Sequence, residues 1–329
     1  MKRLRRTAPA LVVALTLGLL TCRVSSAQSA PSKKEAETMV RNAFAAMDLT
    51  SPGSTPFHLV ASVQYELAGS AQGVYELWWA TPDRWRESFQ TQGGESESNL
   101  ALGNKLYVLR SGPAPSLASL RTREILHPTG PTAFTWTLSV QKVLVTNVNG
   151  RKQICVDAKG SVIEERACLD PVSSKLVSVS ERTNYLEAHR SDFQCLGEKC
   201  FPRDFESRYF DERMRIQVTD LETAGRFTQD VFAVPQGSVE RDWCAVPTQK
   251  GRGTGTSFNV AIGPPRLVAY WLLVGSNGRL ENAVALRSGG SAIDGKLKTF
   301  FQSRTFPVKL CGGRPIEYDV LFDLPSHVQ

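Results

Sequence analysis

The sequence lacks the short motifs that mark the common enzyme and metal-binding classes. It has only four histidines, and none has the His-Glu-x-x-His spacing of a zinc-binding helix. It also has no GxSxG turn and no glycine-rich phosphate loop ending in Gly-Lys-Ser or Gly-Lys-Thr. We therefore predict that the chain is not an enzyme, and we expect no catalytic residues, no cofactor and no bound metal.

Hydrophobic runs long enough to cross a bilayer as a helix are also missing. The apolar run from Ala8 to Leu20 has about 13 residues, whereas a membrane-spanning helix needs roughly 20. Basic residues precede this run and small residues follow it up to Ala27, which is the order of a secretory signal peptide. We predict a signal peptide over residues 1–27 and a mature protein that is periplasmic or secreted.

Two alternatives for the same segment remain open. The residues before Cys22 are similar to a lipobox, so lipidation at Cys22 would anchor the protein to the envelope. An uncleaved segment would act as a membrane anchor. We expect membrane contact only in these two cases.

The excess of basic charge belongs to the predicted signal peptide. The whole chain has a formal net charge of +7, and residues 1–27 contribute five basic residues and no acidic ones, which leaves 7 − 5 = +2. The basic residues are Lys2, Arg3, Arg5, Arg6 and Arg23. The mature chain therefore shows no charge pattern that predicts a nucleic-acid partner.

Six cysteines remain after Cys22, and an even number in an oxidising compartment predicts disulfides. Spacing favours three pairs, namely Cys155 with Cys168, Cys195 with Cys200, and Cys244 with Cys311. The alternative is a zinc site formed by the first four thiolates, although neither pair has the CxxC spacing typical of such sites.

Hydrophobic periodicity predicts an α+β fold. Apolar residues recur at helical spacing over 32–47, and alternation with a period of two begins at Phe57. Further strands are predicted over 74–79, 84–89, 99–109, 153–158, 167–169, 175–181, 204–209, 214–221 and 231–234, and a second helix over 116–125. Because the connections are short, we expect a curved antiparallel sheet wrapped on one or two helices.

Polar residues of possible functional interest are predicted to be solvated. His58 falls on the polar side of its strand, so we interpret it as a surface or hydrogen-bonded histidine. The acidic pairs Glu164-Glu165 and Asp211-Glu212 fall in predicted turns, where solvated carboxylates are common.

A segment rich in Gly, Thr, Arg and Pro over 239–261 predicts a linker, and a small module follows over 262–329. This module has strands over 267–274 and 279–286, joined by the Asn277-Gly278 turn. A helix over 293–303, with Ser291 as its N-cap, and a strand over 316–324 complete a β-β-α-β order.

The small module resembles the C-terminal domain of TonB. The matching features, in chain order, are Asn277-Gly278, Ser288-Gly289, Ile293-Asp294, Phe306-Pro307, and Gly313 with Pro315. The resemblance implies a protein partner that adds a strand to an exposed edge. The partner-strand candidates are Ile316, Tyr318, Val320 and Phe322.

The first domain, over 28–238, resembles the LolA-like family of lipoprotein carriers. The resemblance rests on the N-terminal helix, on the segments 73–79 and 82–86, and on the ending at 227–235. It implies a half-barrel with an apolar cavity, for which the lining candidates are Leu59, Ala61, Val63, Leu77, Trp79 and Trp85. The alternative is that these side chains simply pack against the helices.

Together these patterns predict an exported binding or scaffolding protein with an interaction module at its C-terminus, linked to envelope transport. One alternative is a periplasmic carrier of lipid or another apolar ligand. Another is a TonB-type energy transducer, which requires that the N-terminal helix be retained.

Overall fold

The computed structural model describes residues 30–51, 54–67, 69–126, 139–148, 150–159, 164–181, 186–250 and 267–325. The predicted signal peptide and Cys22 lie outside these residues. Within the ranges that are described, no helix is long and apolar enough to cross a membrane.

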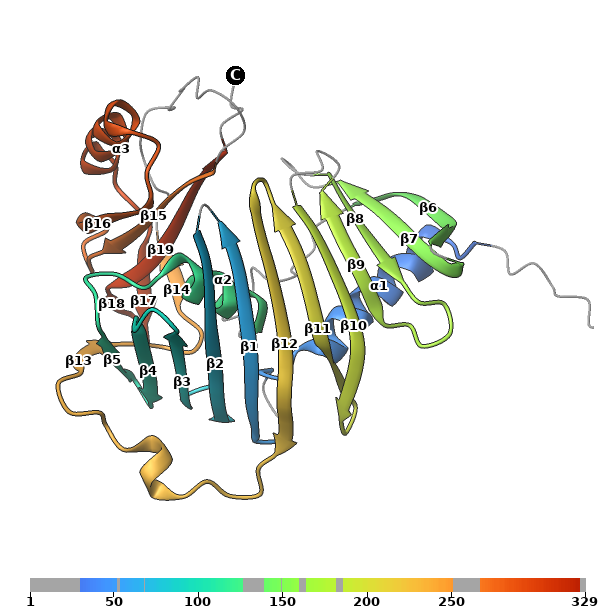
Figure 1. The fold of residues 1–329 in the computed structure, drawn as a ribbon, viewed down its shortest axis with the longest axis horizontal. Helices are drawn as coiled ribbons and strands as arrows, with labels where there is room; N and C mark the ends of the chain where they lie inside the picture. Colours follow the sequence, from blue (N-terminus) through green and yellow to red (C-terminus); the bar gives the residue numbers. More distant parts are fainter. Residues whose placement is uncertain are drawn as a thin grey trace, which may run out of the picture.

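One antiparallel sheet of 13 strands dominates the fold, in the order β13-β5-β4-β3-β2-β1-β12-β11-β10-β9-β8-β7-β6 (Figure 1). The chain starts in the middle of this sheet, builds one side with β1 to β5, and builds the other side with β6 to β12. The strands are β1 (Phe57–Leu67), β2 (Gly69–Thr81), β3 (Arg84–Thr91), β4 (Ser96–Leu102), β5 (Lys105–Arg110), β6 (Ser139–Val148), β7 (Arg151–Lys159), β8 (Glu164–Leu169), β9 (Leu176–Glu181), β10 (Leu186–Leu196), β11 (Lys199–Tyr209), β12 (Glu212–Thr223) and β13 (Val239–Asp242). The sheet is curved and does not close, which confirms the predicted half-barrel.

The α2 half of the sheet consists of β1 to β5, β12 and β13 together with helix α2 (Leu117–Leu126). Alternate residues of its strands point to the concave face and are almost completely buried. They pack against α2 through Leu117, Ala118 and Leu126. This half therefore has a filled hydrophobic core.

The α1 half consists of β6 to β11 and helix α1 (Lys33–Met47). A capping box starts this helix, since the Glu35 amide donates to Ser32 Oγ and the Ser32 amide donates to the Glu35 carboxylate. Ala36, Val40 and Phe44 on its buried face pack against β7, β8 and β9. The predicted N-terminal helix is confirmed.

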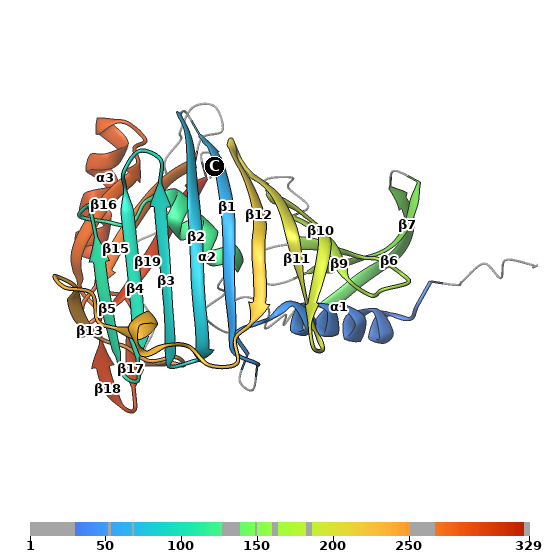
Figure 2. The same ribbon diagram turned by 60° about the horizontal axis from the view of Figure 1, so that its bottom comes forward.

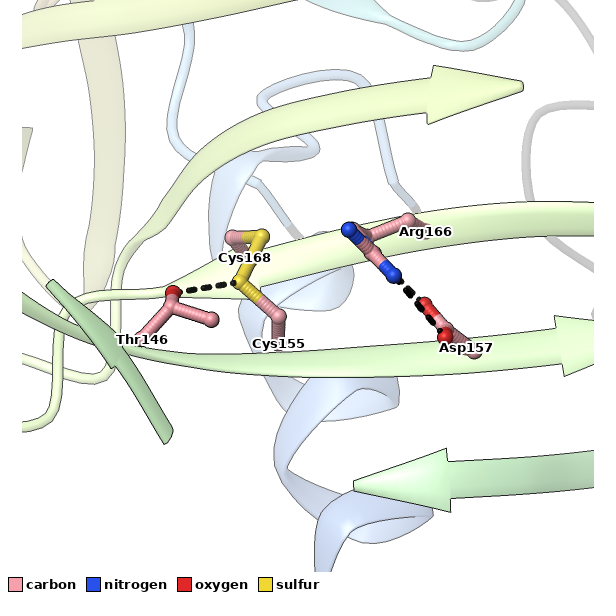
Figure 3. The surroundings of a disulfide bond; sticks show 5 residues. All are labelled: Thr146, Cys155, Asp157, Arg166 and Cys168. Carbon is pink, nitrogen blue, oxygen red and sulfur yellow. Dashed lines mark hydrogen bonds and ion pairs between the residues drawn. A yellow bond between two sulfur atoms is a disulfide. The ribbon is translucent and has the colours of Figure 1, made fainter. Parts of the chain in front are cut away.

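Two of the three predicted disulfides are present, and both lie in the α1 half. Cys155 and Cys168 face each other on β7 and β8 (Figure 3), and Cys195 faces Cys200 on β10 and β11. These four sulfurs are therefore paired with each other and are not arranged around a metal ion. In contrast to the prediction, Cys244 and Cys311 are free thiols. They are nevertheless neighbours, since the Cys311 thiol donates to the carbonyl oxygen of Trp243, the residue before Cys244, at 3.5 Å. Burial and the adjacent Cys244 raise the pKa of Cys311 to about 11.

The C-terminal module confirms the predicted order of strand, strand, helix and strand, with additional short strands. Its elements are β15 (Leu267–Val274), β16 (Leu280–Arg287), α3 (Ser291–Ser303), β17 (Val308–Cys311), β18 (Arg314–Ile316) and β19 (Tyr318–Pro325). Strands β16, β15 and β19 form one sheet, with β19 at its end. Ser291 is the first residue of α3 and not its N-cap, which is Gly290 with a φ of 97°.

The C-terminal module packs on the concave face of the α2 half, beside α2 (Figures 1 and 2). Ala269, Leu286 and Leu321 of the module join the core of that half. Ion pairs reinforce the contact, including Arg121 to Asp323 at 2.7 Å and Arg241 to Glu317 at 3.0 Å. The module is therefore docked on the half-barrel.

Residues 239–250 of the predicted linker contain two short strands. Strand β13 pairs with β5, and β14 (Thr248–Lys250) pairs with β17 of the module. The two strands form because the half-barrel and the module each offer an unpaired sheet edge. Residues 251–261 lie outside the described part of the chain.

Three local predictions are wrong. Residues 231–234 are not a strand, because the chain forms a short 3₁₀ helix over Gln229–Phe232. Glu164 and Glu165 lie in strand β8 and not in a turn. Glu212 is buried at the start of β12, where Arg121 holds its carboxylate at 3.2 Å.

Candidate functional site

A pocket of about 590 Å³ lies between the α2 half and the C-terminal module. Its walls come from β3, β4, β5, α2, β13, the loop that follows β13, and strands β15, β17, β18 and β19. Because segments from residue 85 to residue 321 contribute to it, the pocket exists only when the module is docked.

Apolar side chains form much of the pocket wall. Three tryptophans contribute, namely Trp85 on β3, Trp243 after β13, and Trp271 on β15. The rings of Trp85 and Trp243 meet edge to face, with their centroids 5.6 Å apart. Leu106, Leu120 and Leu321 add aliphatic surface. This wall suits an apolar ligand.

A buried polar cluster forms another part of the wall. Glu87 is only 2% exposed, and its Oε1 lies 2.6 Å from Arg123 Nε. The side-chain amide of Asn99 donates to the same Glu87 oxygen at 2.9 Å, and the Tyr75 hydroxyl donates to Glu87 Oε2 at 2.9 Å. Glu87, Asn99 and Arg123 line the pocket. Arg123 presents a cationic group to the pocket, while Glu87 is held by Arg123, Asn99 and Tyr75.

Glu97 extends this cluster behind the pocket. Arg123 donates to its carboxylate at 3.1 Å and Ser119 donates to it at 2.9 Å. Burial favours a raised pKa for Glu97, but the charges of Arg123 and Arg110 and the Ser119 hydrogen bond outweigh it and hold the pKa below its usual value. Glu97 is therefore ionised, and the two carboxylates are balanced by two guanidinium groups.

Charged residues also surround the part of the pocket near β13 and β18. Arg241 lies 3.0 Å from Glu317 and 3.2 Å from Asp319, which ties β13 to the C-terminal module. Lys309 lies over the ring of Tyr318, 4.4 Å from its centroid, and burial lowers the pKa of this lysine. The Arg241 contacts join the half-barrel to the C-terminal module across the pocket.

The six residues predicted to line a cavity are buried in the core of the α2 half. Each is at most 4% exposed. Of these six, Trp85 lines the pocket between the α2 half and the C-terminal module. A role of the other five in a ligand cavity stays a prediction.

The four partner-strand candidates divide into two groups. Ile316, in β18, and Tyr318, in β19, line the pocket. Val320 and Phe322, in β19, pack against the core that includes α3. Their availability to a partner strand stays a prediction.

Sequence reasoning missed Glu87, Asn99 and Arg123. A signal for Glu87 was present, because the alternation of Trp85, Glu87 and Phe89 places a carboxylate on the buried face of its strand. An ionised group in such a position needs a cationic partner. Its identity as Arg123 depends on how α2 crosses the sheet, which the sequence pattern does not specify.

The strand order and the docked module define an α+β half-barrel protein with an interdomain pocket. No protein-family model and no curated protein matches the chain. Among solved structures, it is similar to a DUF1329 family protein from Desulfovibrio piger, with a TM-score of 0.41 and 9% identity over 62% of this chain and 98% of that one. It is also similar to a LolA superfamily protein from Nitrosomonas europaea, with a TM-score of 0.38 and 10% identity over 60% and 97% of the two chains.

A third similar structure covers more of the chain. The complex of MucA and MucB from Pseudomonas aeruginosa matches with a TM-score of 0.31 and 10% identity, over 87% of this chain and 93% of that one. No protein-family model matches the C-terminal module, so its resemblance to TonB rests on its sequence motifs.

Proposed function

We propose that this chain is an exported, non-enzymatic binding protein that holds an apolar ligand with a polar end in the pocket between the half-barrel and the C-terminal module. The observation that carries the proposal is the pocket itself, of about 590 Å³, lined by three tryptophans and by the buried Glu87–Arg123 pair. This volume lies within the roughly 300–1,000 Å³ of small-molecule sites.

The distribution of side chains supports a ligand with two chemically different parts. The tryptophan and leucine wall suits an acyl chain or a ring system. Arg123 offers a cationic guanidinium group to a polar end, whereas the side-chain amide of Asn99 already donates to Glu87 and Glu97. A purely apolar ligand would lie against this charge without a polar contact to it, which is unfavourable.

The contacts of Glu87, the most buried carboxylate of the pocket, support binding over catalysis. General acid–base catalysis needs a group that can gain or lose a proton near neutral pH. In the pocket, Glu87 is bound by Arg123, Asn99 and Tyr75, so its hydrogen-bonding capacity serves the fold. The two disulfides support export, because such bonds persist in an oxidising compartment.

A pocket-filling variant tests the proposal. Ala245 lines the pocket and belongs to a loop, so Ala245→Trp should fill space without disturbing the core. Its neighbour Val246 is 70% exposed and does not line the pocket, so Val246→Trp is the matched control. We expect the apolar fluorescent probe N-phenyl-1-naphthylamine to bind the wild type and Val246→Trp, and to bind Ala245→Trp at least about tenfold more weakly.

Equal probe binding by the wild type and Ala245→Trp would show that the probe sits elsewhere, and the proposal would be wrong. Absence of probe binding to the wild type would contradict it as well. Native mass spectrometry of protein extracted gently from the periplasm then identifies the ligand, as an added mass that Ala245→Trp reduces.

A second candidate function is strand addition by a protein partner to the C-terminal module. One observation favours it, since β19 is the last strand of its sheet and pairs only with β15 within the described residues. Val320→Pro removes a backbone donor from β19 and should abolish capture of such a partner. Unchanged capture by a variant with a native circular dichroism spectrum would exclude this role.

A further inference from the structure

On the face of the sheet opposite the pocket, three neighbouring strands bring together a histidine and several carboxylates. His58 lies on β1, directly opposite Glu222 on β12. Two residues further along β1, Val60 pairs with Asp220 on β12 and with Glu76 on β2. A ring nitrogen of His58 and carboxylate oxygens of Asp220 and Glu222 all lie within 4.8 Å of one another.

A β-bulge aims the two β12 carboxylates at His58. Before the bulge, Met214, Ile216 and Val218 point to the buried face, whereas after it Leu221 does. The register shifts between Val60 and Ala61, where β12 has one extra residue, Thr219. A bulge of this kind reverses which residues face which side. Without it, Asp220 and Glu222 would point into the hydrophobic core.

Hydrogen bonding fixes the tautomer of His58. Its Nε2 lies 2.9 Å from Glu76 Oε1, and an ionised carboxylate can only accept, so Nε2 carries a hydrogen and donates it. In the neutral ring, Nδ1 then presents a lone pair toward Glu222 Oε1, 3.8 Å away. Two electron-rich atoms facing each other repel, unless a cation lies between them.

The imidazole ring is held in this orientation. Trp78, opposite His58 on β2, stacks on the ring with the centroids 5.2 Å apart and the planes 21° apart. The His58 side chain is 18% exposed, while that of Glu222 is 66% exposed. The ring is thus fixed and the site is open to ions from solvent.

We propose that His58, Asp220 and Glu222 bind a divalent transition metal ion, with Glu76 orienting His58. One imidazole nitrogen and two carboxylate oxygens are a ligand set that zinc accepts, and water completes the coordination. The hydrogen bond from the second ring nitrogen to a carboxylate is the arrangement that orients metal-bound histidines in many proteins. His58 is more than 160 residues away from Asp220 and Glu222 in the chain, so no short sequence motif predicts the site.

Zinc titration by calorimetry tests the proposal on the full mature chain without an affinity tag. The titrations use a Cys244→Ser/Cys311→Ser background, because these two neighbouring thiols would bind zinc themselves. We expect one zinc ion per chain with a micromolar Kd, and a change in tryptophan fluorescence from Trp78 on binding.

Variants assign the ligands. His58→Ala and Asp220→Asn should each weaken zinc binding at least about tenfold, and Glu76→Gln should weaken it by about 10–100-fold through the orientation of His58. His189→Ala is the matched control, because His189 bonds to Glu187 at 2.9 Å without belonging to the cluster. It should leave zinc binding unchanged.

Three results would overturn the proposal. They are a wild-type Kd above about 100 μM, binding that survives both His58→Ala and Asp220→Asn, and a loss in His189→Ala equal to that in His58→Ala. Asp220 is exposed, so Asp220→Asn keeps the proposal testable even if His58→Ala fails to fold. Probe binding in the pocket is measured separately, so the two proposals fail or stand independently.

Discussion

The two halves of the 13-stranded sheet are stabilised in different ways. In the α2 half, strands are covered by α2 and by the C-terminal module, and the resulting core includes side chains as large as Trp79 and Trp85. In the α1 half, α1 is the helix of the described residues that covers the strands, and its core is smaller. Both disulfides of the described chain join strands of the α1 half.

The same contrast holds for charges. The α2 half buries Glu87 and Glu97 against Arg123, whereas the α1 half places Arg166 and Asp157 on its surface, with side chains 46% and 30% exposed (Figure 3). Covalent cross-links therefore occur where apolar burial is limited. Buried ion pairs occur where the core is large enough to exclude water around them.

The largest expected effect is from breaking the buried ion cluster of the α2 half. Arg123→Leu leaves the Glu87 and Glu97 carboxylates without their shared guanidinium, which should cost about 3–5 kcal/mol of unfolding free energy. Urea unfolding followed by circular dichroism measures it. Arg166→Leu removes the corresponding surface pair in the α1 half and should cost less than about 1 kcal/mol. Equal losses in the two variants would remove the electrostatic contrast between the halves.

Removing a disulfide should affect the α1 half selectively. Cys155 and Cys168 are 13 residues apart, so replacing both by Ala should cost about 3 kcal/mol. The pair of Cys195 and Cys200 is 5 residues apart and should cost about 2 kcal/mol.

Hydrogen exchange locates the change. We expect faster exchange in β6, β7 and β8 of the Cys155→Ala/Cys168→Ala variant and unchanged exchange in β1 and β2. If hydrogen exchange became equally faster in both halves, the sheet would open as one unit, and the two halves would not be stabilised separately.

The α2 half was the easier half to predict from sequence. Strand β1 alternates because its one face is buried and its other face is solvated, and this contrast produces the period of two. Strands β6 and β10 were missed because few of their side chains are buried, so their residues follow no such pattern. The two observed disulfides were predicted because each joins neighbouring strands across a short chain separation.

The candidate site was less predictable than the fold. Trp85, Arg123, Trp243 and Trp271 meet only after β13 pairs with β5 and the module docks. Strand β13 lies within residues 239–261, whose composition predicts a linker, and the module follows this segment. The information for the pocket is therefore in long-range packing, which single-sequence periodicity does not carry.

The smallest expected effect is on the pH dependence of the unfolding free energy. Two buried carboxylates of the α2 half should contribute to it with opposite signs. The pKa of Glu97 is lowered in the folded state, so Glu97 contributes stability above its unfolded pKa, near 4.5, which is lost as the pH falls through its folded value. Burial raises the pKa of Glu212, despite Arg121, so its ionisation costs stability as the pH rises from below 4.5 through its folded pKa.

Substitution by glutamine should separate these two behaviours. From pH 4 to pH 7, Glu97→Gln should lose stability relative to the wild type, whereas Glu212→Gln should gain it, each by on the order of 1 kcal/mol. Urea unfolding at several pH values measures the two differences. The opposite signs follow from the number of cations, because Glu97 faces both Arg123 and Arg110 while Arg121 is shared among Glu212, Glu124 and Asp323. If both variants gained or both lost stability over this pH range, burial, and not the local balance of charge, would determine how these carboxylates affect stability.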